Sequence, residues 1–252
     1  MYYNINEVFV SIQGEGVQCG EQAAFIRAQG CPVGCPWCDS GPFYHPDVPQ
    51  DPLVAAAVRV KEGSMVEVPT HIPSKGNTWP GGLGKRLDQY GILAQIPEDI
   101  PRIVITGGEP TLQDWDDVIN TWQSLVGHAR TQFALETSGQ YPWLGSRFPH
   151  WVTVSPKWAH AANKTAWYID TCWWAWVDEL KYVVDDQFSE EVVYEHLRLV
   201  HEYVPDRYMP HVVLMPEGSP PSKESIALTL GFLQRHHDWR MGPRLQYYLG
   251  VK

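Results

Sequence analysis

The second half of the chain alternates short apolar runs with longer segments of helical apolar spacing, and this pattern limits the fold more than any other feature. Residues 103–105, 132–135, 151–154, 180–184 and 212–215 are expected strands, and residues 112–126, 189–203 and 222–235 are expected helices. In repeated strand–helix units, successive strands run parallel and the helices cover the sheet. The pattern therefore predicts an α/β fold with a mostly parallel sheet.

The first 100 residues add strands at 3–12 and 23–27, followed by a proline-interrupted stretch at 41–100. Short helices are expected there over 52–61 and 85–96. With a strand count nearer six than eight, we expect an incomplete, TIM-like barrel of about six mostly parallel strands with outer helices. At 252 residues the chain is long enough for one sizeable domain, so residues 1–252 are expected to form a single unit.

Three of the five cysteines lie within ten residues, in CPVGCPWCDS at 31–40. Prolines and a glycine exclude a regular helix or strand there, so the segment must be a tight loop that gathers its thiolates. An iron–sulfur cluster normally takes four cysteines, and a structural zinc ion takes four Cys or His ligands. Three thiolates would leave one position of a cluster open to a substrate or cofactor. A zinc loop completed by His45, Cys19 or Cys172 is the alternative.

The composition excludes several classes of protein. The 29 acidic residues outnumber the 19 basic ones, and the net charge of −10 argues against non-specific binding of nucleic acid. No apolar run approaches the roughly 20 residues of a membrane-spanning helix, and the N-terminus lacks the features of a signal peptide. The odd number of closely spaced cysteines favours a reducing compartment. We therefore expect a soluble cytoplasmic protein with no membrane partner.

Further motifs accompany the cysteine loop, in a fixed order along the chain. They are SIQGEG at 11–16, FIRAQGC at 25–31, CDS at 38–40, TGGEP at 106–110, ETSG at 136–139, SPK at 155–157 and KYVVD at 181–185. CxxxCxxC resembles the cluster motif of the radical S-adenosylmethionine (SAM) superfamily. The whole set resembles its 7-carboxy-7-deazaguanine synthase (QueE) family. Most of these motifs follow expected strands, so we expect them to meet on one face of the barrel.

The resemblance implies a catalytic centre built on SAM. Cys31, Cys35 and Cys38 would ligate a 4Fe–4S cluster whose open iron binds SAM, and reduction would cleave SAM to a 5′-deoxyadenosyl radical. The implied SAM-binding residues are Trp37, Asp39, Gly107, Gly108, Glu109, Ser138, Ser155 and Lys157. Asp39 could equally be a turn-capping carboxylate.

The resemblance also implies the substrate, 6-carboxy-5,6,7,8-tetrahydropterin. A hydrogen would be abstracted from C6, and ring contraction would give 7-carboxy-7-deazaguanine with loss of ammonia, as in 7-deazapurine pathways of the queuosine type. Arg27 would pair with the substrate carboxylate. The other implied substrate contacts are Ile12, Gln13, Gly14, Glu15 and Thr106. Ser40, where the family usually has Thr, would hold a Mg²⁺ ion.

Two departures from the family pattern stand out. Gln246 and Tyr247 align with a His-Lys pair of the family's C-terminal tail, with Arg244 as a candidate replacement, and part of 41–100 looks like an insertion. The resemblance implies a homodimer and an electron donor such as flavodoxin. The alternatives are another radical SAM enzyme, such as a glycyl-radical activase, and a non-catalytic zinc module.

Overall fold

The computed structural model describes residues 1–31, 33, 35, 38, 85–127, 131–157, 168–218 and 220–251. These residues contain one nine-stranded sheet with the strand order β3-β1-β2-β4-β5-β6-β7-β8-β9. Its strands are β1 (Tyr2–Ile12), β2 (Gln22–Ala28), β3 (Lys85–Asp88), β4 (Arg102–Gly107), β5 (Gln132–Thr137), β6 (Trp151–Val154), β7 (Glu179–Val184), β8 (His211–Pro216) and β9 (Arg240–Met241).

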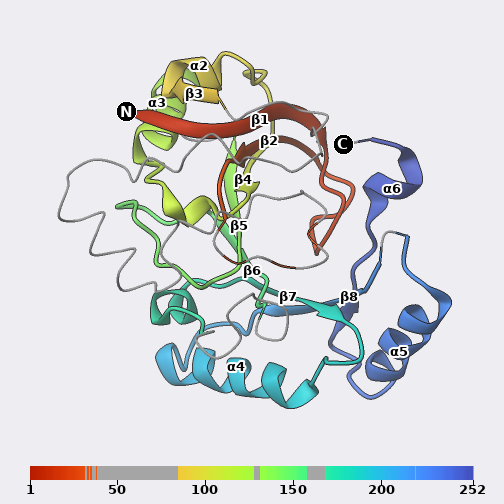
Figure 1. Cartoon of the computed structure of the whole chain (residues 1–252). Coiled ribbons are helices and arrows are strands. Elements are labelled where there is room, and N and C mark those ends of the chain that lie inside the picture. Colours follow the sequence, from red (N-terminus) through yellow and green to blue (C-terminus); the bar gives the residue numbers. More distant parts are fainter. Residues whose placement is uncertain are drawn as a thin grey trace.

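From β2 to β9 every neighbouring pair of strands is parallel, whereas β1 is antiparallel to both β2 and β3. The sheet curves into an open arc (Figure 1). This arrangement confirms the expected α/β partial barrel. The described strands outnumber the expected six or so, because β3 and β9 extend the two edges. Both are short pieces that pair with a neighbour and show no alternation of their own.

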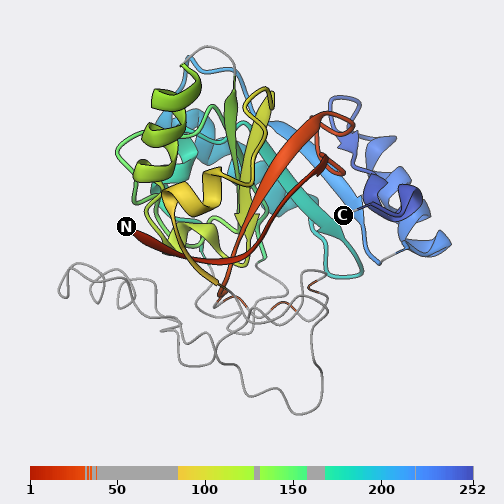
Figure 2. The same ribbon diagram turned by 90° about the horizontal axis from the view of Figure 1, so that it is seen from above.

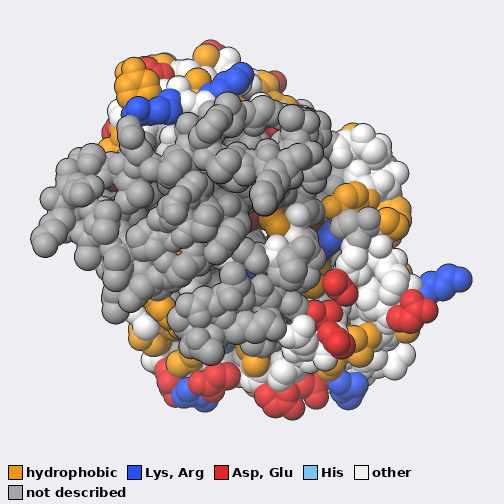
Figure 3. Space-filling model, in the orientation of Figure 1, with side chains coloured by type: hydrophobic (Ala, Val, Ile, Leu, Met, Phe, Trp, Pro, Cys, Tyr) orange, Lys and Arg blue, Asp and Glu red, His pale blue; other side chains and the backbone are white. Residues whose placement is uncertain are grey.

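Helices cover the outer side of the arc (Figures 1 and 2). They are α2 (Gln89–Leu93), α3 (Asp116–Val126), α4 (Glu190–Tyr203) and α5 (Lys223–Leu233), with two 3-10 helices, η1 (Pro110–Leu112) and η3 (Thr171–Ala175). A further short helix, α6 (Leu245–Leu249), lies at the open side of the arc. Figure 3 shows carboxylates gathered along the lower edge of the molecule, where α4 lies. No described helix is long and apolar enough to cross a membrane.

The two faces of the sheet differ because successive side chains of a strand point to opposite sides. Outward-facing residues such as Ile103, Ile105, Phe133, Leu135 and Tyr182 are fully buried and form the main apolar core with the helices. The inner face carries a smaller apolar cluster of Ala23, Phe25, Val104 and Ala134. Two residues farther along β2, β4 and β5, the inner face becomes polar, with Arg27, Thr106 and Glu136.

The helix expected over 85–96 is wrong in its first part. Lys85–Asp88 pairs antiparallel with the start of β1, with Tyr2 opposite Asp88. The helix begins only at Gln89, because the Asp88 carboxylate caps it by accepting from the Gly91 N–H at 2.7 Å. The helix expected over 52–61 and most of the proposed insertion lie outside the described residues.

The helix expected over 112–126 begins later, at Asp116. Glu109 caps the preceding 3-10 turn, and Pro110 is its first residue. Trp115 is fully buried against Tyr3, with 5.1 Å between ring centroids, and its indole donates to the Pro110 carbonyl at 2.8 Å. These contacts hold the chain out of helical geometry until Trp115. The expected helices at 189–203 and 222–235 are confirmed to within two residues.

The N-terminal caps of α4 and α5 differ, and this difference can be tested by mutation. Ser222 Oγ accepts from the Ser225 N–H at 3.0 Å, whereas Ser189 makes no capping hydrogen bond. Ser222→Ala should therefore cost about 1 kcal/mol and lower the thermal midpoint by about 2–4 °C. Ser189→Ala, the matched control, should change it by less than about 1 °C. Equal shifts in calorimetry would contradict the assigned cap.

Candidate active site

A cavity of about 400 Å³ opens on the inner face of the sheet and is lined from many parts of the chain. Its volume is typical of a small-molecule site. The lining includes these predicted site residues: Ile12, Gln13, Gly14, Glu15, Arg27, Cys31, Cys35, Cys38, Thr106, Gly107, Gly108, Ser138, Ser155 and Lys157. Glu109 does not line it. The predicted residues Trp37, Asp39 and Ser40 lie outside the part of the chain that the structure describes.

The loop after β4 is attached closely to the start of the cysteine loop. The Gly108 N–H donates to the Ala28 carbonyl at 3.0 Å, and the Glu109 N–H donates to the Gly30 carbonyl at 2.8 Å. A Cβ atom on Gly108 would come within 2.1 Å of the Gly30 oxygen, and Gly107 has a φ of +116°. Both positions therefore require glycine. The end of β4 thereby fixes where Cys31 begins its loop.

The three loop cysteines are free thiols along the cavity. Burial raises the pKa of Cys31 well above its usual value and that of Cys35 to about 11, the latter opposed in part by Lys157. A metal centre must therefore displace their protons when it binds. Within the described ranges, no three Cys, His, Asp or Glu side chains converge on one ion position. Three soft thiolates are the donor set of a cluster with one open iron, whereas a structural zinc ion needs a fourth ligand.

The remaining members of the zinc alternative do not join this group. Cys19 lies on the turn after β1, where its thiol donates to the Gly14 carbonyl at 3.4 Å, and Cys172 lies in η3. Neither lines the cavity. His45 lies outside the described residues.

Glu109 connects the loops after β4 and β5 from beneath the cavity. It is 1% exposed, and its carboxylate accepts from the hydroxyls of Thr111 at 2.8 Å, Thr137 at 2.6 Å and Ser138. The Ser138 N–H donates to it at 3.0 Å. Nearby, Lys157 donates to Ser155 at 2.5 Å. The contact predicted between Glu109 and the SAM ammonium stays a prediction.

The motif at 11–16 was expected to meet the others because it follows a strand, but its turn, at residues 13–21, reaches the cavity in another way. Because β1 is antiparallel to β2, this turn lies at the opposite end of β2 from the cysteine loop. It reaches the cavity because inner-face side chains hold it: Gln13 donates to Glu136 at 2.9 Å, and the Val17 N–H donates to Glu179 at 2.7 Å. Gly16, with a φ of +72°, leaves room for Glu179, which a Cβ atom would meet at 2.4 Å.

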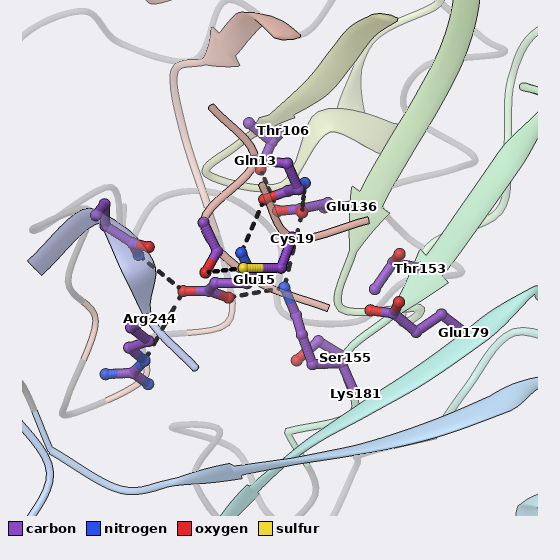
Figure 4. A network of polar contacts seen from close by, with 12 residues as sticks. Gln13, Glu15, Cys19, Thr106, Glu136, Thr153, Ser155, Glu179, Lys181 and Arg244 are labelled. Carbon is purple, nitrogen blue, oxygen red and sulfur yellow. Dashed lines mark hydrogen bonds and ion pairs between the residues drawn. The ribbon is translucent and has the colours of Figure 1, made fainter. Parts of the chain in front are cut away.

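A buried charge network joins this turn to β7 and to the C-terminal segment (Figure 4). The Lys181 ammonium contacts Glu15 at 2.9 Å and Glu136 at 3.7 Å. Arg244 Nε lies 3.8 Å from Glu15, and the Gln246 amide donates to Glu15 at 3.1 Å. The C-terminal segment thus closes on the turn, and Arg244, Gln246 and Tyr247 line the cavity.

These contacts keep Glu15 and Lys181 ionised. Burial alone would raise the pKa of Glu15, but the charges of Lys181 and Arg244 and the hydrogen bonds from Lys181 and Gln246 lower it to about 2. Burial would lower the pKa of Lys181, but Glu136, Glu15 and Glu179 together raise it above its usual range. Both groups are therefore charged throughout the physiological range.

Glu136 and Lys181 begin the ETSG and KYVVD motifs, but neither they nor Glu179 had a predicted role. A signal was present in the sequence, because Glu179 and Lys181 are charged residues two positions apart in an otherwise apolar strand. Such residues point to one face, and a buried charge normally has a partner. Arg27, by contrast, was a predicted site residue, and it lines the cavity with its guanidinium 5.4 Å from the Phe9 ring and its Nε 3.6 Å from Glu7.

Three relatives of this chain share the name 7-carboxy-7-deazaguanine synthase. No family model matches it. The 7-carboxy-7-deazaguanine synthase of Prochlorococcus marinus is 29% identical over 260 residues, covering 98% of this chain and 97% of the relative. The synthase of Synechocystis is 27% identical over 253 residues, covering 99% and 94%. The synthase of Escherichia coli is 32% identical over 158 residues, which is 62% of each chain.

The fold has a counterpart among solved structures. The crystal structure of QueE from Escherichia coli matches with a TM-score of 0.62 and 24% identity, over 96% of this chain and 93% of that chain. At this identity the match supports the fold alone. The full-length sequence relatives carry the functional comparison.

The glycines of the 13–21 turn allow a test of how tightly the turn is held. Gly16→Ala should cost about 3 kcal/mol, from the positive φ and from the clash with Glu179. Gly20→Ala, at a φ of +96° but with open space around it, should cost only about 1 kcal/mol of backbone strain. Chemical denaturation would measure both. Equal losses would show that Glu179 does not confine the turn.

Proposed function

We propose that this chain, which belongs to the 7-carboxy-7-deazaguanine synthase family of the radical SAM superfamily, converts 6-carboxy-5,6,7,8-tetrahydropterin into 7-carboxy-7-deazaguanine with loss of ammonia. The observation that carries the proposal is the single cavity described above. The same cavity is lined by Cys31, Cys35 and Cys38, by Arg27 and by the turn after β1. A metal-binding loop and a cationic recognition site therefore face one volume.

The residues around the cysteines fit a cluster and SAM. The donor set is three soft thiolates, and the Gly107–Gly108 backbone approaches the loop with no side chain between them. Ser138, Ser155 and Lys157 would provide hydroxyl and ammonium donors for the carboxylate or ribose of SAM, and Glu109 an acceptor for its ammonium. Trp37 and Asp39 complete the proposed set. When bound, the reduced cluster and SAM supply the radical that removes a hydrogen atom from the substrate.

The chain's own part in the reaction is to bind and orient the pterin. Arg27 offers a planar guanidinium that can pair with the substrate carboxylate through two hydrogen bonds. It stands four residues before Cys31 in the sequence, so the substrate carboxylate would be held close to the cysteine loop. The backbone and side chains of the 12–15 segment would receive the edge of the pterin ring, and Thr106 would contact it as well. Ser40 is proposed as a Mg²⁺ ligand beside the substrate carboxylate.

The cavity walls would also exclude water and oxygen from the reaction. The C-terminal segment is joined to the turn by the hydrogen bond from the Leu245 N–H to the Gly14 carbonyl, 2.9 Å long. This contact places Gln246 and Tyr247 beside the substrate volume. The proposal includes a single domain over residues 1–252, a cytoplasmic location, an electron donor such as flavodoxin and a homodimer. These four points are supported by family membership rather than by a contact described above.

The proposal is tested by anaerobic reconstitution with iron and sulfide, followed by reduction with SAM and the carboxylated tetrahydropterin. Mass spectrometry should detect 5′-deoxyadenosine and 7-carboxy-7-deazaguanine together, and Cys35→Ala should abolish both products. Cys172→Ala is the control, because Cys172 lies away from the cavity and should leave both unchanged.

Each other outcome points elsewhere. Deoxyadenosine without the deazaguanine would retain the radical SAM chemistry and exclude the substrate, in favour of another enzyme of the superfamily. Absence of both iron–sulfide incorporation and SAM cleavage would favour the alternative in which the cysteine loop binds zinc.

A second prediction concerns how the cluster loop is held. Gly108→Ala should push the loop after β4 away from Gly30 and displace Cys31, because the added Cβ atom would come within 2.1 Å of the Gly30 oxygen and 3.3 Å of the Cys31 Cβ atom. We expect the iron and sulfide content after reconstitution to fall at least about fivefold, because backbone atoms cannot move aside as a flexible side chain can. Gly231→Ala, a glycine in α5 with open space around it, should retain full cluster content. Full cluster content in Gly108→Ala would show that β4 does not position the cysteine loop.

A further inference from the structure

Lys181 is a buried cation to which the chemistry proposed above gives no role. It is 7% exposed and stands on the inner face of β7, between Leu180 and Tyr182, which are fully buried on the outer face. An ammonium group taken out of water is costly unless it is paired. Lys181 lines the cavity rather than the apolar core, so its carboxylate partners there account for the buried charge.

Two carboxylates form ion pairs with this ammonium group, and a third acts on it from farther away. Glu15 lies 2.9 Å from the Lys181 Nζ, and Glu136 lies 3.7 Å from it. Glu179, two residues earlier on the same face of β7, adds a third negative charge that acts on Lys181. Arg244 is a second cation on Glu15, at 3.8 Å. Lys181 is therefore the central positive charge of an acidic cluster drawn from three separate parts of the chain (Figure 4).

The carboxylates beside Lys181 also hold the groups proposed to meet the pterin. Glu136 accepts from the Gln13 amide at 2.9 Å through one oxygen and from the Thr106 hydroxyl at 3.2 Å through the other. Glu15 is itself one of the proposed substrate contacts. Gln13, Glu15 and Thr106 are thus each joined to Lys181 directly or through one carboxylate.

We propose that Lys181 is a positioning residue for substrate recognition: through its ion pairs at 2.9 Å and 3.7 Å it holds Glu15 and Glu136 as acceptors facing the N–H donors of the heterocycle's edge. This inference rests on the proposed function, because it takes the carboxylated pterin as the ligand. Ionised acceptors form stronger hydrogen bonds than neutral ones and penalise a ligand that lacks the matching donor. Lys181 itself touches neither the reacting carbon nor the cluster in this scheme.

Removal of the lysine distinguishes a positioning role from a purely structural ion pair, because only a positioning role makes substrate affinity depend on pH. In Lys181→Met, the buried carboxylates of Glu15 and Glu179 lose the cation that lowers their pKa values, so burial raises these values. A carboxyl group that binds a proton becomes a donor and opposes the substrate's N–H groups. Arg244 still faces Glu15, and the nearby Cys19 thiol has a raised pKa and stays neutral. Substrate affinity in this variant should therefore depend on pH.

The experiment compares reconstituted wild type with Lys181→Met and Lys181→Arg between pH 5.5 and 8.5. We measure KM and kcat for the carboxylated tetrahydropterin, its dissociation constant by equilibrium dialysis, and the deoxyadenosine formed without substrate. Lys181→Met should raise KM about 30-fold at pH 7.5, the loss of one charged hydrogen-bond network, with a further rise at lower pH. Lys181→Arg should recover most of the loss. SAM cleavage without substrate should be unchanged.

Arg102→Met is the matched control. Arg102 is also a buried cation paired with a carboxylate, Glu21 at 2.8 Å, but it lies outside the cavity. This variant should lower the thermal midpoint and leave KM and its pH profile as in wild type. If Lys181→Met does not fold, the double variant Lys181→Met with Glu179→Gln replaces it, because Glu179 does not line the cavity and its neutralisation removes one of the repelling charges. It should show the same weakened binding.

The outcomes separate the two proposals. Wild type that neither binds nor converts the pterin overturns the proposed function and this inference together. Wild-type turnover combined with an unchanged KM and a flat pH profile in a folded Lys181 variant overturns the inference alone. An equal loss of SAM cleavage and pterin binding, independent of pH, would also overturn it, because Lys181 would then support the fold rather than recognition.

Discussion

The ion pair between Glu15 and Lys181 joins parts of the chain that the sheet leaves apart. An incomplete barrel has two edges that no strand pairing connects, and here β1 and β2 lie near one edge and β7 and β8 near the other. Glu15, at 2.9 Å from Lys181, spans that opening together with the hydrogen bond from Val17 to Glu179. A buried ion pair adds little net stability, because desolvation offsets much of the attraction, but it is strongly unfavourable to break. Its effect is to specify one position for the turn.

That specification depends on the difference between the two faces of the sheet. The outer face of β4, β5 and β7 is mostly apolar, so packing against the helices fixes those strands, and the hydrogen bond between Tyr182 of β7 and His196 of α4 adds a polar contact. The inner face is then free to carry charge. Arg27, Thr106 and Glu136 occupy equivalent places on adjacent strands, one step beyond Phe25, Val104 and Ala134. The polar groups of the cavity therefore lie in register on adjacent strands, next to the small apolar cluster.

The sequence was sufficient for the parts of the fold and site that depend on local periodicity. The parallel strands, α4 and α5 follow from apolar spacing, and the motifs at the ends of β2, β4, β5 and β6 line one cavity or support it from beneath, as Glu109 does. Local periodicity could not give the direction of β1, because an antiparallel strand shows the same alternation as a parallel one. It also missed the delayed start of α3, which results from the contact between Tyr3 and Trp115, more than 100 residues apart in the sequence.

The same limit explains why Lys181 was overlooked and why its partners matter. Glu15 and Lys181 are separated by 166 positions, and no spacing rule connects them. Their relation follows only from the sheet order, which brings the end of β1 across the opening to β7. The cysteine loop, by contrast, is placed by neighbours in the sheet, since β2 leads into it and the glycines of β4 fix its start. The two halves of the cavity are therefore positioned by different means. Strand pairing sets the half that would carry the cluster, together with Arg27 and Thr106, and buried charge sets the position of the turn that would contact the substrate.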